Sequence, residues 1–184
     1  MSYDDNNIFA KILRGEIACD KIYEDDFILS FINVSRSKWS QNWRCHVRIR
    51  KKKKMIYNEN NIFAKILRGE IPCNKIYEDD FVFSFHDINP QKKIHALVIP
   101  KGKYVDLDDF SLNASSDEMV GLLKGINIVA KKLQVSVDTG SGYRVLVNIS
   151  EHGGQEVPHL HFHLFGGERV GKMVEWVKKS REII

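Results

Sequence analysis

The chain has 184 residues, of which 43% are hydrophobic and 28% charged, and its formal net charge is +4. This composition is typical of a globular protein, and the absence of any apolar run near the roughly 20 residues needed to cross a bilayer excludes a membrane span. The length suits one domain with an appendage rather than two complete domains. The charge is unevenly placed, because residues 1–54 hold 12 basic and 7 acidic side chains whereas residues 55–184 hold 16 and 17.

Residues 6–31 and 60–85 form an internal repeat at an offset of 54 residues, and only four of the 26 aligned positions differ. The similarity stops at Ile32 against His86. Solenoid repeats recur at least three times, so a single partial copy is not typical of them. We interpret residues 1–31 as a truncated duplicate of the N-terminus of the following domain, and its helix and one or two strands are too few to bury a core alone.

The segment between the copies, residues 32–54, carries nine basic side chains and no acidic one. This pattern permits nucleic-acid binding, with Trp39 and Trp43 as stacking residues. A solvated, disordered linker explains the same composition, and we favour it, so nucleic acid is not an expected partner. The complete domain then occupies residues 55–184, with its core at residues 60–167 and a C-terminal extension.

Periodicity and turn residues predict the elements of the complete domain. Apolar residues at helical spacing predict two main helices and a further short one, at residues 61–68, 115–133 and 172–183. Alternating patterns bounded by turns predict five strands, at residues 75–78, 81–86, 95–99, 143–147 and 159–165. We therefore expect an α+β fold, an antiparallel sheet of about five strands with helices on one face.

The N-terminus and the cysteines indicate the compartment. The sequence begins MSYDDNN, which is acidic and is not followed by the apolar core of a secretory signal, so we expect a cytoplasmic protein. Cys19, Cys45 and Cys73 lie far apart and form no CxxC pair. This spacing favours three reduced thiols over a disulfide framework or a zinc cage.

Three of the seven histidines, His159, His161 and His163, alternate with apolar residues. On a strand this pattern places the three imidazoles on one face, and burying them costs free energy unless each is hydrogen-bonded. A solvent-facing polar side of an edge strand is one alternative. Metal binding is another, although His159 and His163 would lie about 13 Å apart at the backbone, which leaves at most two of them plus a ligand from elsewhere.

Nucleophilic catalysis on phosphorus accounts for the whole pattern. A neutral imidazole is a competent nucleophile at pH 7, and neighbouring imidazoles can orient it and hold phosphate oxygens. In the preceding loop, Asn148 offers an amide, and Gly153 and Gly154 let backbone N–H groups approach an anion closely.

Residues 159–165 (HLHFHLF) resemble the histidine triad motif that names the HIT superfamily. The resemblance covers about 110 residues and is to the Hint branch, the histidine triad nucleotide-binding proteins. The stretches that carry it are NIFAKILRGEIP (61–72), YEDD (77–80), FHDINPQ (85–91), HALVIPK (95–101) and GGQEVPHLHFHLFGG (153–167).

The resemblance implies a hydrolase that cleaves nucleoside 5′-phosphoramidates or related adenylates without a metal or another cofactor. His161 would attack the α-phosphorus and form a transient nucleotidyl-histidine. His163 would bind phosphate oxygens, and His159 and His95 would orient the nucleophile. The partner would be a purine nucleotide such as AMP, GMP or an adenylate conjugate, and two subunits would pair into one ten-stranded sheet.

The other contacts to the nucleotide also follow from the resemblance. Asp87 matches the carboxylate that binds ribose hydroxyls. The positions that match the pocket around the base are Phe63, Phe85, Ile88 and Leu97, each of which would otherwise be interpreted as plain core. The positions near the phosphate are Asn148, Gly154 and Gln155.

Two departures limit what is transferred. Eukaryotic members often have Ser where Glu156 stands, so the proton donor to the leaving group is left open. The sequence after Gly167 also differs, so the preference for a leaving group is left open as well. The alternatives are a nucleotide-binding regulatory module with incidental turnover and a hydrolase of dinucleoside polyphosphates.

Overall fold

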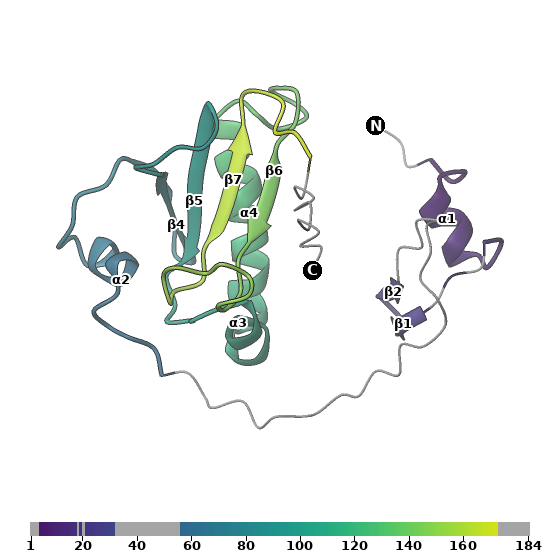
Figure 1. The fold of residues 1–184 in the computed structure, drawn as a ribbon, viewed down its shortest axis with the longest axis horizontal. Coiled ribbons are helices and arrows are strands. Elements are labelled where there is room, and N and C mark those ends of the chain that lie inside the picture. The colour runs from purple at the N-terminus through teal and green to yellow at the C-terminus, as the bar shows by residue number, and fades with distance from the viewer. Residues whose placement is uncertain (1–3, 18, 20, 32–55, 173–184) are drawn as a thin grey trace, which may run out of the picture. The chain divides into compact units, whose positions relative to one another are not determined.

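Figure 1 shows the computed structural model, which describes residues 4–17, 19, 21–31 and 56–172. The chain divides into two compact units, Met1–Lys51 and Lys52–Ile184.

Several expectations fall on other residues. The linker at residues 32–54, Cys45 within it, and all but the first residue of the helix expected at 172–183 lie outside the described part of the chain. Within that part, Cys19 and Cys73 are free thiols. None of the described helices is both long and apolar enough to cross a membrane.

Among its described residues, the first unit contains one helix and one hairpin, the elements expected of the shorter copy. α1 (Ile8–Leu13) begins after Asn7, whose side-chain oxygen caps the first turn. β1 (Lys21–Glu24) and β2 (Leu29–Phe31) pair antiparallel. Most of the large apolar side chains described in this unit are exposed.

The second unit contains three helices and five strands among its described residues. The helices are α2 (Ile62–Leu67), α3 (Leu107–Asn113) and α4 (Ser116–Lys132). The strands are β3 (Lys75–Glu78), β4 (Val82–His86), β5 (Ile94–Pro100), β6 (Arg144–Val147) and β7 (Phe162–Gly166). They form one sheet in the order β3-β4-β5-β7-β6, and each neighbouring pair is antiparallel. The predicted α+β class with a five-stranded antiparallel sheet is therefore confirmed.

The two faces of this sheet carry separate apolar cores. One face packs against α3 and α4 through a cluster that includes Val82 and Val98. The other packs against α2 through Phe63 and the strand residues Phe83 and Leu97. The expectation that all helices lie on one face is therefore wrong for α2, which lies beside β4 and apart from α4 in Figure 1. The physical reason is that β4 and β5 carry apolar side chains on both faces of the sheet. The side chains on the second face must also be shielded from water, and α2 packs over them.

α4 is the helix predicted at residues 115–133, and its start has the expected capping box between Ser115 and Glu118. It lies very close to β4, because a Cβ added at Gly125 would come within 2.5 Å of the Val82 side chain. Glycine therefore sets the distance between the helix and the sheet. α3 is an additional helix that the sequence patterns did not predict.

Candidate active site

The strand that carries the histidines is shorter than expected. β7 begins at Phe162, so His163 lies on the strand, whereas His159 and His161 lie on the chain leading into it. The prediction of a strand over residues 159–165 is wrong for its first three residues. Pro100 on the neighbouring strand has no N–H with which to extend the pairing, and the Leu160 N–H donates instead to the Tyr104 carbonyl at 2.8 Å.

The alternation nevertheless separates the imidazoles from the main core. Leu160 and Leu164 are fully buried in the cluster beneath α4. The rings of His159 and His161 contact Phe63 of α2, with centroid distances of 6.1 and 5.1 Å. The histidines that precede β7 therefore lie on the α2 side of the sheet, opposite Leu160 and Leu164.

A backbone contact determines which nitrogen of His161 is free. Its Nδ1 lies 2.7 Å from the carbonyl oxygen of His159. A carbonyl can only accept, so Nδ1 carries the proton and donates it, and Nε2 keeps its lone pair. Burial lowers the pKa of His161, while the bond to the His159 carbonyl partly opposes this shift. The ring is therefore neutral at pH 7, the state that a nucleophile requires.

His159 is completely buried and bonded at both ring nitrogens. Its Nε2 donates to the Pro100 carbonyl at 3.0 Å, so its Nδ1 is the acceptor for the Tyr57 hydroxyl at 2.5 Å. Burial lowers the pKa of His159 to about 4, although the bond to Pro100 opposes the shift. The two bonds fix the His159 ring in place. The backbone carbonyl of the same residue is thereby held where it accepts from His161 Nδ1.

His95 and His163 form a second orienting pair. The Gln91 backbone N–H points at His95 Nδ1 over a long distance of 3.4 Å, which favours the tautomer with the His95 proton on Nε2. In that tautomer His95 Nε2 donates to His163 Nδ1 at 2.9 Å, and His163 carries its own proton on Nε2. Burial, with a smaller effect from His161, lowers the pKa of His163 to about 4, and burial also lowers the pKa of His95 against the opposing charge of Asp87. A neutral His163 can thus still donate a hydrogen bond to a phosphate oxygen.

Asp87, His95 and His163 also form a group that could hold a metal ion. Their ligand atoms all lie within 4.8 Å of one another, and the Asp87 carboxylate is 3.4 Å from His95 Nε2. The sequence suggested two histidines of the triad plus a ligand from elsewhere, whereas only one triad histidine belongs to this group. The His95–His163 hydrogen bond already satisfies the two facing nitrogens without an ion.

Three of the four residues expected around the base come together. Phe63, Phe85 and Leu97 are buried in the cluster beneath α2. Ile88 is 85% exposed and lies outside this cluster. The structure therefore brings together an apolar wall next to His161, but does not add Ile88 to it.

The loop before the histidines is shaped by local bonds. Gly154 has a φ of +75°, a conformation that favours glycine. The Gln155 amide nitrogen donates to the carbonyls of Val105 and Val157, and its oxygen accepts from the Ser150 N–H. Both amide hydrogens of Gln155 are therefore bonded within the protein. The side chain stabilises the loop and has no free amide hydrogen to donate to a phosphate.

Asn148 and Glu156 in this loop remain accessible. Asn148 is half-buried, and its amide nitrogen makes one long contact of 3.4 Å to the Gly154 carbonyl. Glu156 is exposed, and its charge raises the pKa of His161 slightly against the larger effect of burial. Glu156 thus lies close enough to His161 to affect its pKa, whereas Asn148 is only weakly engaged within the loop.

Comparison with known proteins identifies this arrangement. The family model of the HIT domain matches residues 68–170. The chain belongs to the HIT family. An uncharacterized 13.2 kDa HIT-like protein of Azospirillum brasilense is 52% identical over 118 residues, which make up 64% of this chain and 94% of that protein. The purine nucleoside phosphoramidase of Escherichia coli (strain K12) is 40% identical over 116 residues, 63% of this chain and 94% of the enzyme.

Solved HIT structures agree with the fold. A HIT family hydrolase from Clostridium thermocellum has a TM-score of 0.58 and 35% identity, covering 64% of this chain and 99% of that one. A histidine triad protein from Clostridium difficile has a TM-score of 0.57 and 38% identity, covering 64% and 98%. These relatives are matched almost end to end by less than two thirds of this chain, so the rest of the chain has no counterpart in those alignments.

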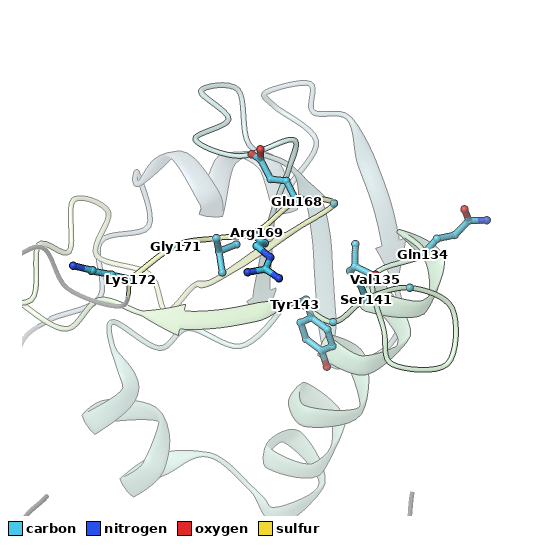
Figure 2. Close-up of a pocket in the computed structure, with 12 residues that line it drawn as sticks. Gln134, Val135, Ser141, Tyr143, Glu168, Arg169, Gly171 and Lys172 are labelled. Atoms are coloured by element: carbon cyan, nitrogen blue, oxygen red, sulfur yellow. The ribbon is translucent and has the colours of Figure 1, made fainter.

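Figure 2 shows a separate pocket, and no histidine is among the described residues that line it. It is formed by the loop after α4 and the segment that follows β7, and Tyr143 and Arg169 are among the side chains that line it. None of the site residues predicted from the sequence lines this pocket. We therefore place the candidate site at the histidines.

Sequence reasoning missed Tyr57 in the HIT site. The tyrosine lies 102 positions before His159, so no local pattern links them. One signal was available, because the repeat alignment extends upstream and pairs Tyr57 with Tyr3 at the same offset of 54 residues.

Proposed function

We propose that the second unit of this HIT protein hydrolyses purine nucleoside 5′-phosphoramidates or related adenylates through a nucleotidyl-histidine intermediate. The observation that carries the proposal is the His161 Nδ1 bond to the His159 carbonyl, which leaves Nε2 as an unprotonated, neutral nucleophile. The likeness to a purine nucleoside phosphoramidase supports the choice of substrate class.

In the first step, His161 Nε2 forms a bond to the α-phosphorus, and the bond from phosphorus to the amine nitrogen breaks. The amine leaves after taking up a proton. In the second step, water attacks the same phosphorus, the bond to Nε2 breaks, and the nucleoside monophosphate is released. We propose that the His163 Nε2–H donates to the phosphate oxygens on which negative charge develops in both steps.

Asp87 would bind the ribose, and Phe63, Phe85 and Leu97 would contact the base. These roles follow from the family resemblance and are compatible with the buried cluster beside His161. The ten-stranded dimer also stays a prediction. It requires one of the two sheet edges, β3 or β6, to pair with its copy in a second chain.

Replacing His161 with Ala tests the role of the nucleophile. Because alanine cannot form the covalent intermediate, turnover of adenosine 5′-phosphoramidate should fall by about 1,000-fold or more. The affinity for AMP, measured by calorimetry, should stay within a few fold. Exposed His152 offers a matched control, since His152→Ala removes an imidazole outside the site and should change neither quantity. Turnover by His161→Ala within tenfold of the unmodified chain would exclude the proposed nucleophile.

A further inference from the structure

The two copies of the repeat adopt the same local structure. The N-caps Asn7 and Asn61 have φ and ψ of −65° and 160° against −64° and 155°. The hairpins β1-β2 and β3-β4 share one register, including the irregularity between their first two residue pairs. Each copy also has the same ion pair after its helix, Arg14–Glu16 and Arg68–Glu70. The first copy therefore has the same local structure as α2, β3 and β4.

The copies differ in what covers their apolar side chains. Val82 of the second copy is completely buried against α4, whereas its counterpart Ile28 is 57% exposed. Leu67 packs against the cluster beneath α2, whereas its counterpart Leu13 is 63% exposed. The first copy thus presents the apolar face that in the second copy is covered by β5 and α4.

We propose that residues 6–31 can take the place of residues 60–85 of the same chain against β5 and α4, so that the domain has two alternative folded arrangements. The occupant is specified by the chain itself, since 22 of the 26 aligned residues are identical. In the alternative arrangement, residues 32–93 form the connection between β2 and β5. The ends of that connection meet at the place where β4 now continues toward β5, and the entropy cost of closing a loop grows only with the logarithm of its length.

Two of the four sequence differences between the copies explain why the second copy, and not the first, packs against β5 and α4 in the structure. Gly125 leaves so little room at Val82 that an added Cβ would lie 2.5 Å from it, and Ile28 would bring one more carbon to this contact. Leu29 would replace the aromatic ring of Phe83 in the cluster beneath α2. Both changes disfavour the first copy, and so does the long connection, which makes the exchanged arrangement the minor one.

The exchange preserves the residues that this segment supplies to the histidine site. Phe63 and Phe85 have the counterparts Phe9 and Phe31, and Tyr57 has Tyr3 just before the repeat. The proposal concerns the fold, and its test does not depend on the proposed reaction.

Substitutions at the equivalent positions Val82 and Ile28 test the exchange in the full chain. Val82→Asp places a charge in the core beneath α4 and disables the second copy, whereas Ile28→Asp alters an exposed residue of the first. Hydrogen exchange with mass spectrometry should find α4 and β5 still protected in Val82→Asp, with residues 21–31 gaining protection and residues 75–85 losing it. Ile28→Asp should match the unmodified chain.

In the double variant Val82→Asp/Ile28→Asp neither copy can pack against β5 and α4. Both elements should therefore lose their protection from hydrogen exchange. The proposal is overturned if Val82→Asp alone loses that protection as completely as the double variant, or if it stays folded with residues 75–85 still protected. Mixing the ¹⁵N-labelled double variant with excess unmodified chain should not restore the protection of α4 and β5 in the labelled chain. Restored protection in the labelled chain would show exchange between chains and overturn the same-chain arrangement.

Discussion

Two backbone contacts decide which imidazole nitrogen is available in the site. The His159 carbonyl holds the proton of His161 on Nδ1, and the Gln91 N–H, acting through His95, favours the tautomer of His163 with its proton on Nε2. One ring is thereby left with a free lone pair and the other with a free donor. This pairing of nucleophile and donor is the arrangement that attack on a phosphate ester or amide needs.

The buried histidines predict how stability depends on pH. The pKa of His159 is lowered by burial from 6.5 to about 4 in the folded protein. Between these values the unfolded chain binds more protons than the folded chain. The contribution of the neutral His159 ring to the free energy of unfolding is therefore fully present above about pH 6.5 and is lost as the pH falls toward 4. For His159 alone the loss is on the order of 3 kcal/mol.

Urea unfolding at a series of pH values between 7 and 4.5 measures this loss. His159→Gln removes the titrating group, so the fall in the free energy of unfolding between pH 6.5 and 5 should be shallower than in the unmodified chain. His152→Gln, at an exposed position, should leave the slope unchanged. An identical slope in His159→Gln and the unmodified chain would show that burial of this ring is not linked to stability.

At the scale of elements, periodicity predicted those segments whose burial follows one simple pattern. α4 was found because its apolar residues repeat at helical spacing, and β4 and β5 were found as short apolar segments bounded by turn residues. α3 was missed because it is short and only Phe110 among its residues is buried, which leaves no apolar stripe to detect. The start of β7 was placed too early because the lack of an N–H at Pro100 acts on a neighbouring strand, which local patterns do not show.

The same limit applies to the site. The alternation of the three histidines predicted, from local sequence alone, that they form the reacting group, and their chemical role stays a prediction. Asp87 and His95 could be assigned only through the family resemblance, and in the structure the pairing of β5 with β7 brings His95 next to His163. The Tyr57 contact to His159 depends on tertiary structure and was not predicted.

The close approach of α4 to β4 predicts a specific interaction between two residues. Gly125→Ala should lower the free energy of unfolding by about 1–3 kcal/mol, because the new methyl group overlaps the Val82 side chain. Val82→Ala makes room, so the two changes together should cost less than the sum of their separate effects.

Urea unfolding of the two single variants and the double variant measures this coupling. Lys124→Ala, on the exposed side of the same helix, is the control and should change stability by no more than about 0.5 kcal/mol. Strictly additive effects of Gly125→Ala and Val82→Ala would contradict the proposed steric contact.

At the scale of the whole molecule, the chain combines a HIT domain with a spare copy of the domain's first elements. The excess positive charge lies in residues 1–54, whereas residues 55–184 carry 16 basic and 17 acidic side chains. Phosphate recognition in the proposed site therefore depends on histidines and backbone geometry rather than on a large positive field.

The most direct test of the proposed chemistry is to locate the covalent intermediate. The full chain is mixed with an adenylate substrate, quenched in denaturant at alkaline pH, digested, and its peptides are analysed by mass spectrometry. We expect one AMP group on His161, within residues 159–165, and no adduct in His161→Ala. An AMP group on another residue, or full turnover by His161→Ala, would rule out His161 as the nucleophile.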